Sequence, residues 1–595
     1  MQRLLYWMGL LACCAFGGAA QAAQPSAGIT WHSWNDELFQ QARAQNRFVL
    51  LDLEAIWCHW CHVMDQTTYQ DRAVEGLIDQ KYIAVRVDQD ADPALSVRYQ
   101  DYGWPATIVL APDGTEIVKR RGYLSPDSMA SLLAAIIKDP SPGPSVVAQE
   151  AIEPAHSAGL NEQGRKALLT TYFDSYDAQY AGWGTEQKFI DADSLEYALA
   201  HAKSEPRQAA MARKTLDASR SLIDPVWAGV YQYSDTRDWQ SPHFEKIIAF
   251  QTQYIRLYAQ GYRLLGSAAY LKAAQSIDHY VESFLTSPEG VVYTSQDADV
   301  DTQLTGHLFY AMGDTERRRH PSPRIDTHVY ARENGWAILA LAALYDASGD
   351  ERYLARARRA ADWVSAHRAL GAGGYSHDER AATQAALGDT LAMGQGFLAL
   401  YVAAGDRGSL VKAREAARFI DTHFSVAAGG YATATLPAHG RGVFRQPVRD
   451  VDENIVLARF ANGLYRYTGN TTYQKIAHRA MRYLAAPQLA DGQRLRTGIL
   501  LADEELAREP THVTIVGHKD DASAQALHAA ALRYPAVYRR IDWWDKRDGA
   551  MPNPDVQYPE LKRAAAFICT GNSCSLPVFD SIQLAATLDL SSAPD

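Results

Sequence analysis

The chain has 595 residues, of which 47% are hydrophobic and 21% charged, so its composition is that of a folded globular protein rather than a disordered, collagen-like or coiled-coil one. A length of this order predicts several domains, since single domains commonly hold about 100–200 residues. The 58 basic and 69 acidic residues give a net charge of −11, which leaves no excess of positive charge for a phosphate backbone. We therefore expect no nucleic-acid partner.

The first residues have the pattern of a secretory signal peptide. Arg3 supplies a positive charge, an apolar run extends from Leu4 to Ala20, and small residues surround a cleavage point after Ala22. Residues 1–22 are therefore predicted to be a signal peptide and the mature protein to be periplasmic. A membrane anchor and a lipoprotein cut before Cys13 are the alternatives. Since no later segment has the pattern of a membrane span, we expect none in the mature chain.

Short apolar runs alternate with helical patterns in a predicted domain at 28–139. The runs lie at 47–57, 82–88 and 107–111, and helical patterns lie at 71–80 and 125–138. This alternation predicts a small α/β domain. The proline-rich stretch 140–158 is predicted to be a linker, because its prolines cannot continue a helix.

Long amphipathic helices fill residues 159–505. Short breaks, in most of which an aromatic residue follows a glycine within three residues, leave room for two helices between them, which predicts six helical hairpins. Six hairpins can close into a toroid, an α/α barrel with a pocket at the ends of its inner helices, whereas an open solenoid is the alternative. The charged stretch from Asp314 to Arg324 is expected to be an insertion, and its basic run from Arg317 to His320 a solvated loop. The breaks begin at Gly182, Gly229, Gly290, Gly374, Gly430 and Asp491.

Residues 506–595 return to mixed patterns and predict a small C-terminal α/β region. Strand-like runs lie at 512–516 and 564–568, and a helical pattern lies at 523–533. Cys569 and Cys574 follow the second run. We expect them to bridge a loop, with a role as an electron relay as the alternative, because neither follows an evident turn from strand to helix.

The motif Trp57-Cys58-His59-Trp60-Cys61 is the strongest chemical signal of the sequence. It places two cysteines one helical turn apart directly after a predicted buried strand, which suits a disulfide that forms and breaks reversibly. Cys58 is the expected attacking thiol, because the helix amides and dipole favour its thiolate. A protonated His59 would favour the thiolate further.

Two residues outside the motif complete the predicted redox site. Asp52, six residues before Cys58 on the strand, is the expected proton acceptor for Cys61. Pro105 precedes the third predicted strand, and we expect a cis peptide bond there, beside the disulfide, where the segment can hold an extended substrate chain. The disulfide itself is the redox group, and no cofactor is expected.

The same residues allow three other hypotheses. The spacing of Cys58, Cys61 and His62 fits covalent attachment of a c-type haem. Zinc could use these residues with His59, although His59 lies between the thiols and cannot easily share their coordination sphere. A structural disulfide without redox activity is the third. We favour a redox-active disulfide and no metal, because a buried run directly before the motif suits a thioredoxin domain.

Several motifs together resemble the spermatogenesis-associated protein 20 family. That family joins a thioredoxin domain to a six-hairpin barrel similar to those of glycosidases and N-acylglucosamine epimerases. The resemblance therefore implies this fold and a capacity for redox chemistry, and it names no substrate. The motifs are CHWCHVM at 58–64, Gly103-Trp104-Pro105, Asp238-Trp239 through PHFEK at 242–246, SQDAD at 295–299, and the segment 569–577.

Acidic residues at breaks and helix starts are the candidates for a barrel pocket. Glycoside chemistry needs two carboxylates about 5–10 Å apart and aromatic side chains that bind sugar faces. Acids at helix starts also cap helices, aromatic side chains at helical spacing form cores, and a histidine can be structural, so these roles stay open. The candidates are Asp238, Trp239, His243, Glu245, Asp297, Asp299, Asp326, Glu333, Asp452 and Glu453.

The sequence thus predicts a thiol–disulfide oxidoreductase with a thioredoxin-like domain, a six-hairpin α/α barrel and a small C-terminal α/β region. Cys58 would attack a disulfide of a protein substrate or redox partner, Cys61 would resolve the mixed disulfide, and the barrel would select substrates or bind a carbohydrate-like ligand. One alternative is a carbohydrate-active barrel, hydrolase or epimerase-like, under redox control by the thioredoxin domain. The other is a client-binding protein without turnover.

Overall fold

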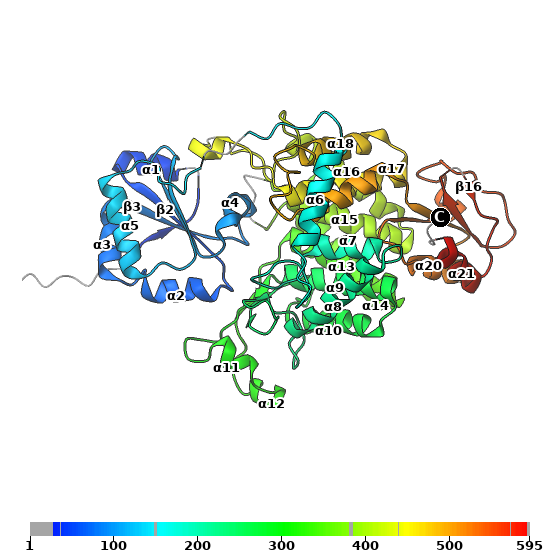
Figure 1. The fold of residues 1–595 in the computed structure, drawn as a ribbon, viewed down its shortest axis with the longest axis horizontal. Coiled ribbons are helices and arrows are strands. Elements are labelled where there is room, and N and C mark those ends of the chain that lie inside the picture. Colours follow the sequence, from blue (N-terminus) through cyan, green and yellow to red (C-terminus); the bar gives the residue numbers. More distant parts are fainter. Residues whose placement is uncertain are drawn as a thin grey trace, which may run out of the picture.

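The protein is described by a computed structural model at residues 28–35, 37–147, 151–379, 385–437, 440–571 and 573–591. The predicted signal peptide at 1–22 and Cys13 lie outside these residues. A sheet domain, a helical barrel and a second, smaller sheet domain lie in a row (Figure 1). Within the described ranges, no helix has both the length and the apolar character to cross a membrane.

The first domain, which we call the redox domain, is built on a five-stranded sheet of order β1-β3-β2-β4-β5. The central strand β2 pairs with β3 in parallel and with β4 antiparallel, and its middle residues are buried, as the predicted apolar run requires. The strands are β1 (Trp31–His32), β2 (Phe48–Glu54), β3 (Tyr82–Asp88), β4 (Ala106–Leu110) and β5 (Glu116–Arg121). The helices are α1 (Leu38–Gln45), α2 (His59–Thr67), α3 (Arg72–Lys81), α4 (Pro93–Tyr99) and α5 (Pro126–Lys138).

The helical region is a closed barrel of inner and outer helices. Each inner helix contacts the next, and the last, α19, contacts the first, α7. The ring therefore closes, and the open solenoid is wrong. The inner helices are α7 (Ala192–His201), α9 (Ile248–Leu265), α13 (Ala331–Ser348), α15 (Leu387–Ala404), α17 (Val451–Thr468) and α19 (Thr497–Ala507). The outer helices are α6 (Glu162–Asp174), α8 (Pro206–Ser219), α10 (Ala268–Phe284), α14 (Glu351–His367), α16 (Arg407–Phe424) and α18 (Thr471–Leu484).

Glycines in the left-handed conformation end several inner helices and allow the tight turn to the outer partner. Gly266, Gly349 and Gly469 have φ values of 74°, 74° and 65° and follow α9, α13 and α17. Each of these turns joins an inner helix to the outer helix that follows it in the chain.

Short strands line the loops at the N-terminal ends of the inner helices. In one set, β8 pairs with β9 and β9 with β10, and a second pair joins β6 and β7. These strands are β6 (Tyr233–Ser234), β7 (Pro242–His243), β8 (Lys246–Ile247), β9 (Ser295–Gln296) and β10 (Ile325–Asp326), and a further hairpin has β11 (Ala369–Gly371) and β12 (Gly374–Tyr375).

The charged insertion begins with the short helix α12 (Asp314–Arg317), which projects from the barrel together with the short helix before it, α11 (Gly306–Tyr310) (Figure 1). The expectation of a fully solvated basic run is wrong for Arg317. Its guanidinium is completely buried and lies 2.6 Å from Asp224. A buried guanidinium needs such a partner, so Arg317 anchors the insertion.

The C-terminal domain packs on the opposite end of the barrel from the redox domain (Figure 1). Its sheet has the order β14-β13-β15-β16. The domain contacts the C-terminal ends of the inner helices. Tyr401 donates a hydrogen bond to Asp542 at 2.6 Å, and Asp346 forms an ion pair with Arg539 at 2.7 Å. Its elements are β13 (Thr511–Val516), α20 (Ala522–Leu532), β14 (Arg539–Trp544), β15 (Ala565–Thr570), β16 (Ser573–Cys574) and α21 (Ser581–Ser591). The redox domain therefore faces the N-terminal ends of the inner helices.

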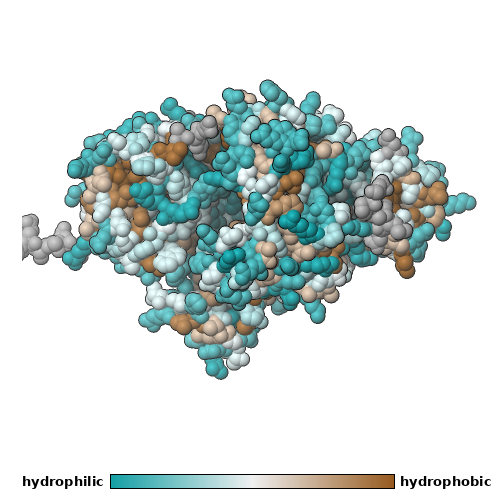
Figure 2. Space-filling model, in the orientation of Figure 1, coloured by the Kyte–Doolittle hydropathy of each residue, from teal (hydrophilic) through white to brown (hydrophobic). Residues whose placement is uncertain are grey.

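The face of the molecule in Figure 2 is mainly hydrophilic, with hydrophobic side chains in scattered small groups. Scattered apolar residues of this kind are normal on a folded protein. On this face the surface therefore gives no sign of a broad apolar docking patch.

Candidate functional site

The two cysteines of the motif form a disulfide across the first turn of α2. Cys58 is the N-cap residue of this helix and follows β2 closely, and its sulfur accepts a hydrogen bond from the Cys61 amide at 3.2 Å. Helix amides and the helix dipole favour negative charge at this position. The geometry therefore stabilises a thiolate on Cys58 when the disulfide opens.

A c-type haem would be bonded to the sulfurs of Cys58 and Cys61, and zinc would be coordinated by them. In the structure the two sulfurs are bonded to each other. The two histidines are also engaged, since His62 lies 3.1 Å from the Ile56 carbonyl and His59 contacts an acid of the barrel. These contacts hold both rings in place beside the disulfide rather than around a shared ion.

Asp52 is buried in the sheet below the motif and belongs to a charged cluster. Its carboxylate lies 3.2 Å from Arg86, which also pairs with Glu54 and Asp65. Burial, opposed by Arg86, raises the pKa of Asp52 to about 6. Asp52, Glu54 and Asp65 are the one cluster of possible metal ligands in the described part of the chain whose ligand atoms lie close enough together to bind one ion. The guanidinium of Arg86 already forms an ion pair with each of these three acids.

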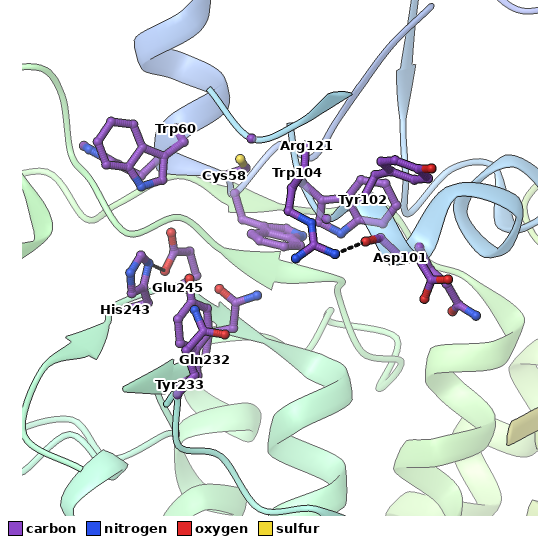
Figure 3. A pocket seen from close by; sticks show the side chains of 16 residues that line it. Cys58, Trp60, Asp101, Tyr102, Trp104, Arg121, Gln232, Tyr233, His243 and Glu245 are labelled. Atoms are coloured by element: carbon purple, nitrogen blue, oxygen red, sulfur yellow. Dashed lines mark hydrogen bonds and ion pairs between the residues drawn. The ribbon is translucent and has the colours of Figure 1, made fainter. Parts of the chain in front are cut away.

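The Trp104–Pro105 peptide bond is cis, as the sequence predicts. Trp104 lies beside Cys58 in the wall of a cavity, where Figure 3 shows both side chains. The predicted segment therefore lies next to the disulfide.

A cavity of about 480 Å³ lies between the redox domain and the barrel, and Cys58 lines it. Trp60 and Arg121 are further residues of the wall formed by the redox domain. The opposite wall belongs to the barrel, from which Gln232, Tyr233, His243 and Glu245 point toward the redox domain (Figure 3). The disulfide is thus enclosed between two domains, and we call this space the interdomain cleft.

Glu245 is the buried acid of the barrel wall. Its side chain is nearly inaccessible, burial raises its pKa, and one of its oxygens forms no hydrogen bond within the described chain. His243 lies 3.8 Å from it and 2.7 Å from Asp235, and its ring stacks on Tyr233. Two predicted barrel residues, Glu245 and His243, therefore belong to the wall opposite the disulfide.

Two other predicted acids hold the histidines of the redox motif. Asp299 lies 2.5 Å from the Nδ1 atom of His59, and Asp297 lies 3.7 Å from His62. The hydrogen bond that His59 donates to Asp299 raises the pKa of His59. Burial acts to raise the pKa of Asp299, but the hydrogen bonds from His59 and from the Gly306 amide together outweigh it, and the pKa lies below its usual value. These acids dock the redox domain on the barrel.

An apolar contact covers the other side of the disulfide. Ile247, two residues after Glu245, packs with Cys58 and Cys61, and Phe250 lies against the same cluster. Only 4% of Cys58 and 3% of Cys61 are exposed, so the interdomain cleft is the route along which a reactant reaches Cys58.

A second contact between the domains reaches Trp57. The indole of Trp57 donates a hydrogen bond to Asp90 at 2.7 Å, and the Asp90 carbonyl lies 2.6 Å from His377 of the barrel. Burial raises the pKa of Asp90, and the neighbouring Asp88 raises it further. The position of the redox motif is therefore tied to the barrel through a buried acid.

The remaining predicted barrel residues are distributed over several places. Asp326 lies 2.5 Å from His328, and Glu333 lies 2.7 Å from Arg332, at the N-terminal ends of the inner helices. Glu453 and Asp452 lie in the first turn of α17, where Glu453 is partly buried and Asp452 is exposed. Asp238 is exposed in a turn, and Trp239 is buried with its indole on the Tyr180 carbonyl. The structure does not bring these residues into the interdomain cleft.

Sequence reasoning missed Asp90, His377, Gln187, Gln232 and Ile247. Their roles depend on contacts between segments far apart in the chain, for example 287 residues between His377 and Asp90. A single sequence carries no signal for such contacts.

The second cysteine pair also forms a disulfide. Cys569 and Cys574 lie directly opposite each other on the antiparallel strands β15 and β16. This disulfide closes a hairpin and does not begin a helix.

Comparisons with known proteins agree with the two-part architecture. Residues 20–138 match a thioredoxin family model described as "Protein of unknown function, DUF255". Human spermatogenesis-associated protein 20 is 26% identical over 310 residues, which cover 46% of this chain and 39% of the human protein. The thiol:disulfide interchange protein DsbD of Pseudomonas fluorescens is 40% identical over 78 residues, 13% of each chain.

The barrel is similar to that of cellobiose 2-epimerase from Bacillus thermoamylovorans, with 12% identity and a TM-score of 0.44, over 54% of this chain and 86% of the epimerase. The matched segment spans about two fifths of the human relative's length. The chain is thus similar in sequence to spermatogenesis-associated protein 20, and in it a DUF255 thioredoxin-like domain precedes a helical barrel.

Proposed function

We propose that the protein is a thiol–disulfide oxidoreductase that works through Cys58 and Cys61. The observation that carries this proposal is the disulfide at the start of α2, where the amide of Cys61 points at the Cys58 sulfur and Cys58 alone of the pair lines the interdomain cleft. One sulfur is thus open to attack and the other is placed to resolve the mixed disulfide. The similarity to the interchange protein of Pseudomonas fluorescens supports this chemistry.

The reduction potential of the Cys58–Cys61 pair tests the proposal. It is measured by equilibration with glutathione buffers, with Cys569 and Cys574 replaced by serine so that one couple is observed. A reversible two-electron couple supports the proposal, and its value indicates the direction of use, since oxidants and isomerases lie near about −120 to −180 mV and thioredoxin near about −270 mV. A disulfide that does not cycle in any buffer contradicts it.

A carbohydrate-active barrel is the second candidate, and one observation favours it. Glu333, Asp389 and Glu453 at the N-terminal ends of inner helices each have a carboxylate oxygen without a hydrogen bond in the described part of the chain. Burial raises the pKa of Glu453 to about 8, while Glu333 is paired with Arg332. A buried carboxyl with a raised pKa is the kind of group that serves as the general acid in glycoside chemistry. Oligosaccharide turnover that Glu453→Gln abolishes and Cys58→Ser leaves unchanged would establish it.

Binding without turnover is the remaining alternative. It predicts that unfolded clients bind to both the wild type and Cys58→Ser, with no change in client thiols. The periplasm is the compartment that we propose for the protein. Disulfide exchange with newly folding proteins takes place in an oxidising compartment of this kind.

A further inference from the structure

A thiol that attacks the Cys58–Cys61 disulfide has to lose its proton, because the thiolate is the form that attacks a disulfide sulfur. Cys58 is 4% exposed, and Ile247 of the barrel covers part of the disulfide. A sulfur that reaches Cys58 has therefore shed most of its water, and this desolvation costs far more free energy for a thiolate than for a neutral thiol. A base inside the interdomain cleft would let the substrate enter as a neutral thiol.

Within the described chain, the acids that line the cleft are Asp101 and Glu245, and they differ in burial. The side chain of Asp101 is 65% exposed and lies 3.4 Å from Arg494. Glu245 is 3% exposed, and its Oε2 atom has no hydrogen-bond partner in the described structure. A buried carboxylate oxygen without a partner is rare, because its desolvation is not compensated. Glu245 is therefore the acid of the cleft with a strong acceptor left for a ligand.

Glu245 lies beside the reactive end of the redox motif. The backbone amide of His59, the residue after Cys58, is close enough to the Glu245 carboxyl to lower its pKa. Ile247, two residues further along the chain, packs with both cysteines. Figure 3 shows the Glu245 side chain directed toward the redox domain, on the opposite wall of the cleft from Cys58. The carboxyl thus adjoins the space that a sulfur bound to Cys58 occupies.

The groups around Glu245 leave it able to accept a proton. Burial raises the pKa of Glu245, His243 opposes this shift, and Asp297 adds to it. A carboxylate with a raised pKa is a better proton acceptor than an exposed one. His243 is less suited to this role, because it already lies 2.7 Å from Asp235. The titratable and charged groups that face Glu245 or share the cleft with it are Tyr233 of β6, His243 of β7, Asp297 after β9, His59 of α2, and Asp101 and Arg121 of the redox domain.

We propose that Glu245 is a catalytic residue of the disulfide exchange, whose carboxylate takes the proton of a substrate thiol as the substrate sulfur attacks Cys58. In the reverse reaction the same carboxyl returns the proton to the departing sulfur. The barrel thus supplies the base for the substrate sulfur, whereas Asp52 of the redox-domain sheet is the acceptor predicted for Cys61. This inference rests on the proposed oxidoreductase function and adds a barrel residue to its active site.

The steps conserve protons and electrons. The substrate thiol gives its proton to Glu245 while its sulfur bonds to Cys58, the bond between Cys58 and Cys61 breaks, and the Cys61 thiolate takes up a proton. A second substrate thiol then releases a proton, which balances the one that Cys61 took up, and attacks the first substrate sulfur. Cys58 leaves as a thiolate and takes the proton from Glu245. Two electrons have passed from the substrate dithiol to the Cys58–Cys61 disulfide.

Single-turnover reduction of the oxidised full-length protein by two reductants tests the inference. Dithiothreitol has to lose a proton when it attacks, whereas tris(3-hydroxypropyl)phosphine is an uncharged nucleophile with no proton on its phosphorus. Both reductants expel the Cys61 sulfur, so a group that acts on the proton of the nucleophile affects dithiothreitol alone. Thiols formed at Cys58 and Cys61 are alkylated at set times and counted by mass spectrometry of the peptide that contains them.

We expect Glu245→Gln to lower the dithiothreitol rate constant at least about 10-fold at pH 7, since general base catalysis contributes about 10²-fold or more. At pH 9 the difference should shrink to less than about 2-fold, because the thiol then ionises without a base. The phosphine rate constant should change less than about 2-fold at either pH, which also shows that the variant has kept its cleft.

Glu186→Gln is the matched control, because Glu186 is an exposed acid of the barrel that does not line the cleft, and we expect it to change neither rate constant. A dithiothreitol rate constant that Glu245→Gln leaves unchanged or raises at pH 7 overturns the inference. Equal slowing of dithiothreitol and the phosphine also overturns it, since Glu245 would then act through the shape of the cleft. A wild type that dithiothreitol does not reduce contradicts the proposed function itself, so the two failures are distinguishable.

Discussion

The two disulfides of this protein lie in small sheet domains on opposite ends of the barrel, and they differ in what surrounds them (Figure 1). Cys58–Cys61 spans the first turn of a helix and faces a cleft, with a barrel acid on each of the two histidines of its motif. Cys569–Cys574 joins opposite positions on two paired strands. Helix amides stabilise a thiolate in the first case, and no helix start does so in the second.

The comparison shows that local secondary structure decides what a disulfide can do. At a helix start the Cys58 sulfur keeps its hydrogen bond from the Cys61 amide as a thiolate, so the reduced form of the pair is favoured. Between paired strands the disulfide mainly restricts the unfolded chain. Redox chemistry and structural bridging thus follow from the backbone on either side of each cysteine.

Replacement of the attacking cysteine is the sharpest test of this difference. Cys58→Ser should lower disulfide exchange at least about 1,000-fold, because serine does not form the mixed disulfide. Cys61→Ser should instead accumulate a mixed disulfide with the substrate, visible by mass spectrometry. Residual exchange in Cys58→Ser that disappears when Cys569 and Cys574 are also replaced would assign turnover to the second pair and break the comparison.

The acid below the first disulfide provides the next largest effect. Burial raises the pKa of Asp52 from 3.8 to about 6 in the folded protein, so its ionisation costs stability as the pH rises from about 4 to about 6. Asp52→Asn should therefore raise the free energy of unfolding by about 2–3 kcal/mol at pH 7 and leave it nearly unchanged at pH 4. Urea unfolding at both pH values measures this.

Glu153→Gln, at an exposed acid outside the helices and strands, is the control for Asp52→Asn and should change stability at neither pH. Equal effects of Asp52→Asn at pH 4 and pH 7 would contradict the assigned pKa. Slower exchange in Asp52→Asn despite higher stability would identify Asp52 as the proton acceptor predicted for Cys61.

Removal of the second disulfide should change stability without changing turnover. The sequence separation of Cys569 and Cys574 is 5, and closing so short a loop stabilises a fold by about 2 kcal/mol. Replacing both by serine should therefore lower the unfolding free energy of the C-terminal domain by this amount, measured by thermal unfolding, while exchange at Cys58 stays at the wild-type rate. A large loss of exchange would show that the pair relays electrons.

The ion pair between the domains should have the smallest effect and a defined pH window. The pKa of His59 is raised above 6.5 and that of Asp299 lowered below 3.8, so the pair stabilises fully between about pH 4 and pH 6.5. Its contribution is lost as the pH rises through the His59 pKa or falls through the Asp299 pKa. Asp299→Asn should cost about 1 kcal/mol within this window and less above it.

Thermal unfolding from pH 4 to pH 9 measures the Asp299→Asn difference, and Glu316→Gln, at an exposed acid of the insertion, serves as its control. A difference that is constant over this range would show that Asp299 acts through packing and not through the ion pair with His59.

The sequence alone determined the fold class and the reactive sulfurs. A buried run followed directly by two cysteines one turn apart places a disulfide at a helix start, because strand and helix patterns are local. Breaks such as those at Gly374 and Gly430 predicted the boundaries between helical hairpins for the same reason. The spacing of the predicted hairpins allowed either a closed barrel or an open solenoid, and the resemblance to a known family favoured the barrel.

The tertiary structure decided what the barrel residues do. The sequence grouped Glu245, Asp297 and Asp299 as candidates for a barrel pocket, and the fold places them against the redox domain instead. Gln187 and Gln232 carry no motif and become visible only as part of a wall opposite Cys58. Arg317 is buried where its charged neighbours predicted solvent, because Asp224, 93 residues earlier, lies beside it.

The physical reason for this division is the range of the forces involved. Helix and strand periodicity, turn conformation and the spacing of cysteines depend on neighbours within a few residues, so they can be read from one sequence. Docking of the redox domain depends on hydrogen bonds such as that from His59 to Asp299, 240 residues apart, and on burial that shifts the pKa values of both domains. Which side chains face the disulfide is therefore decided only when the chain has closed its barrel.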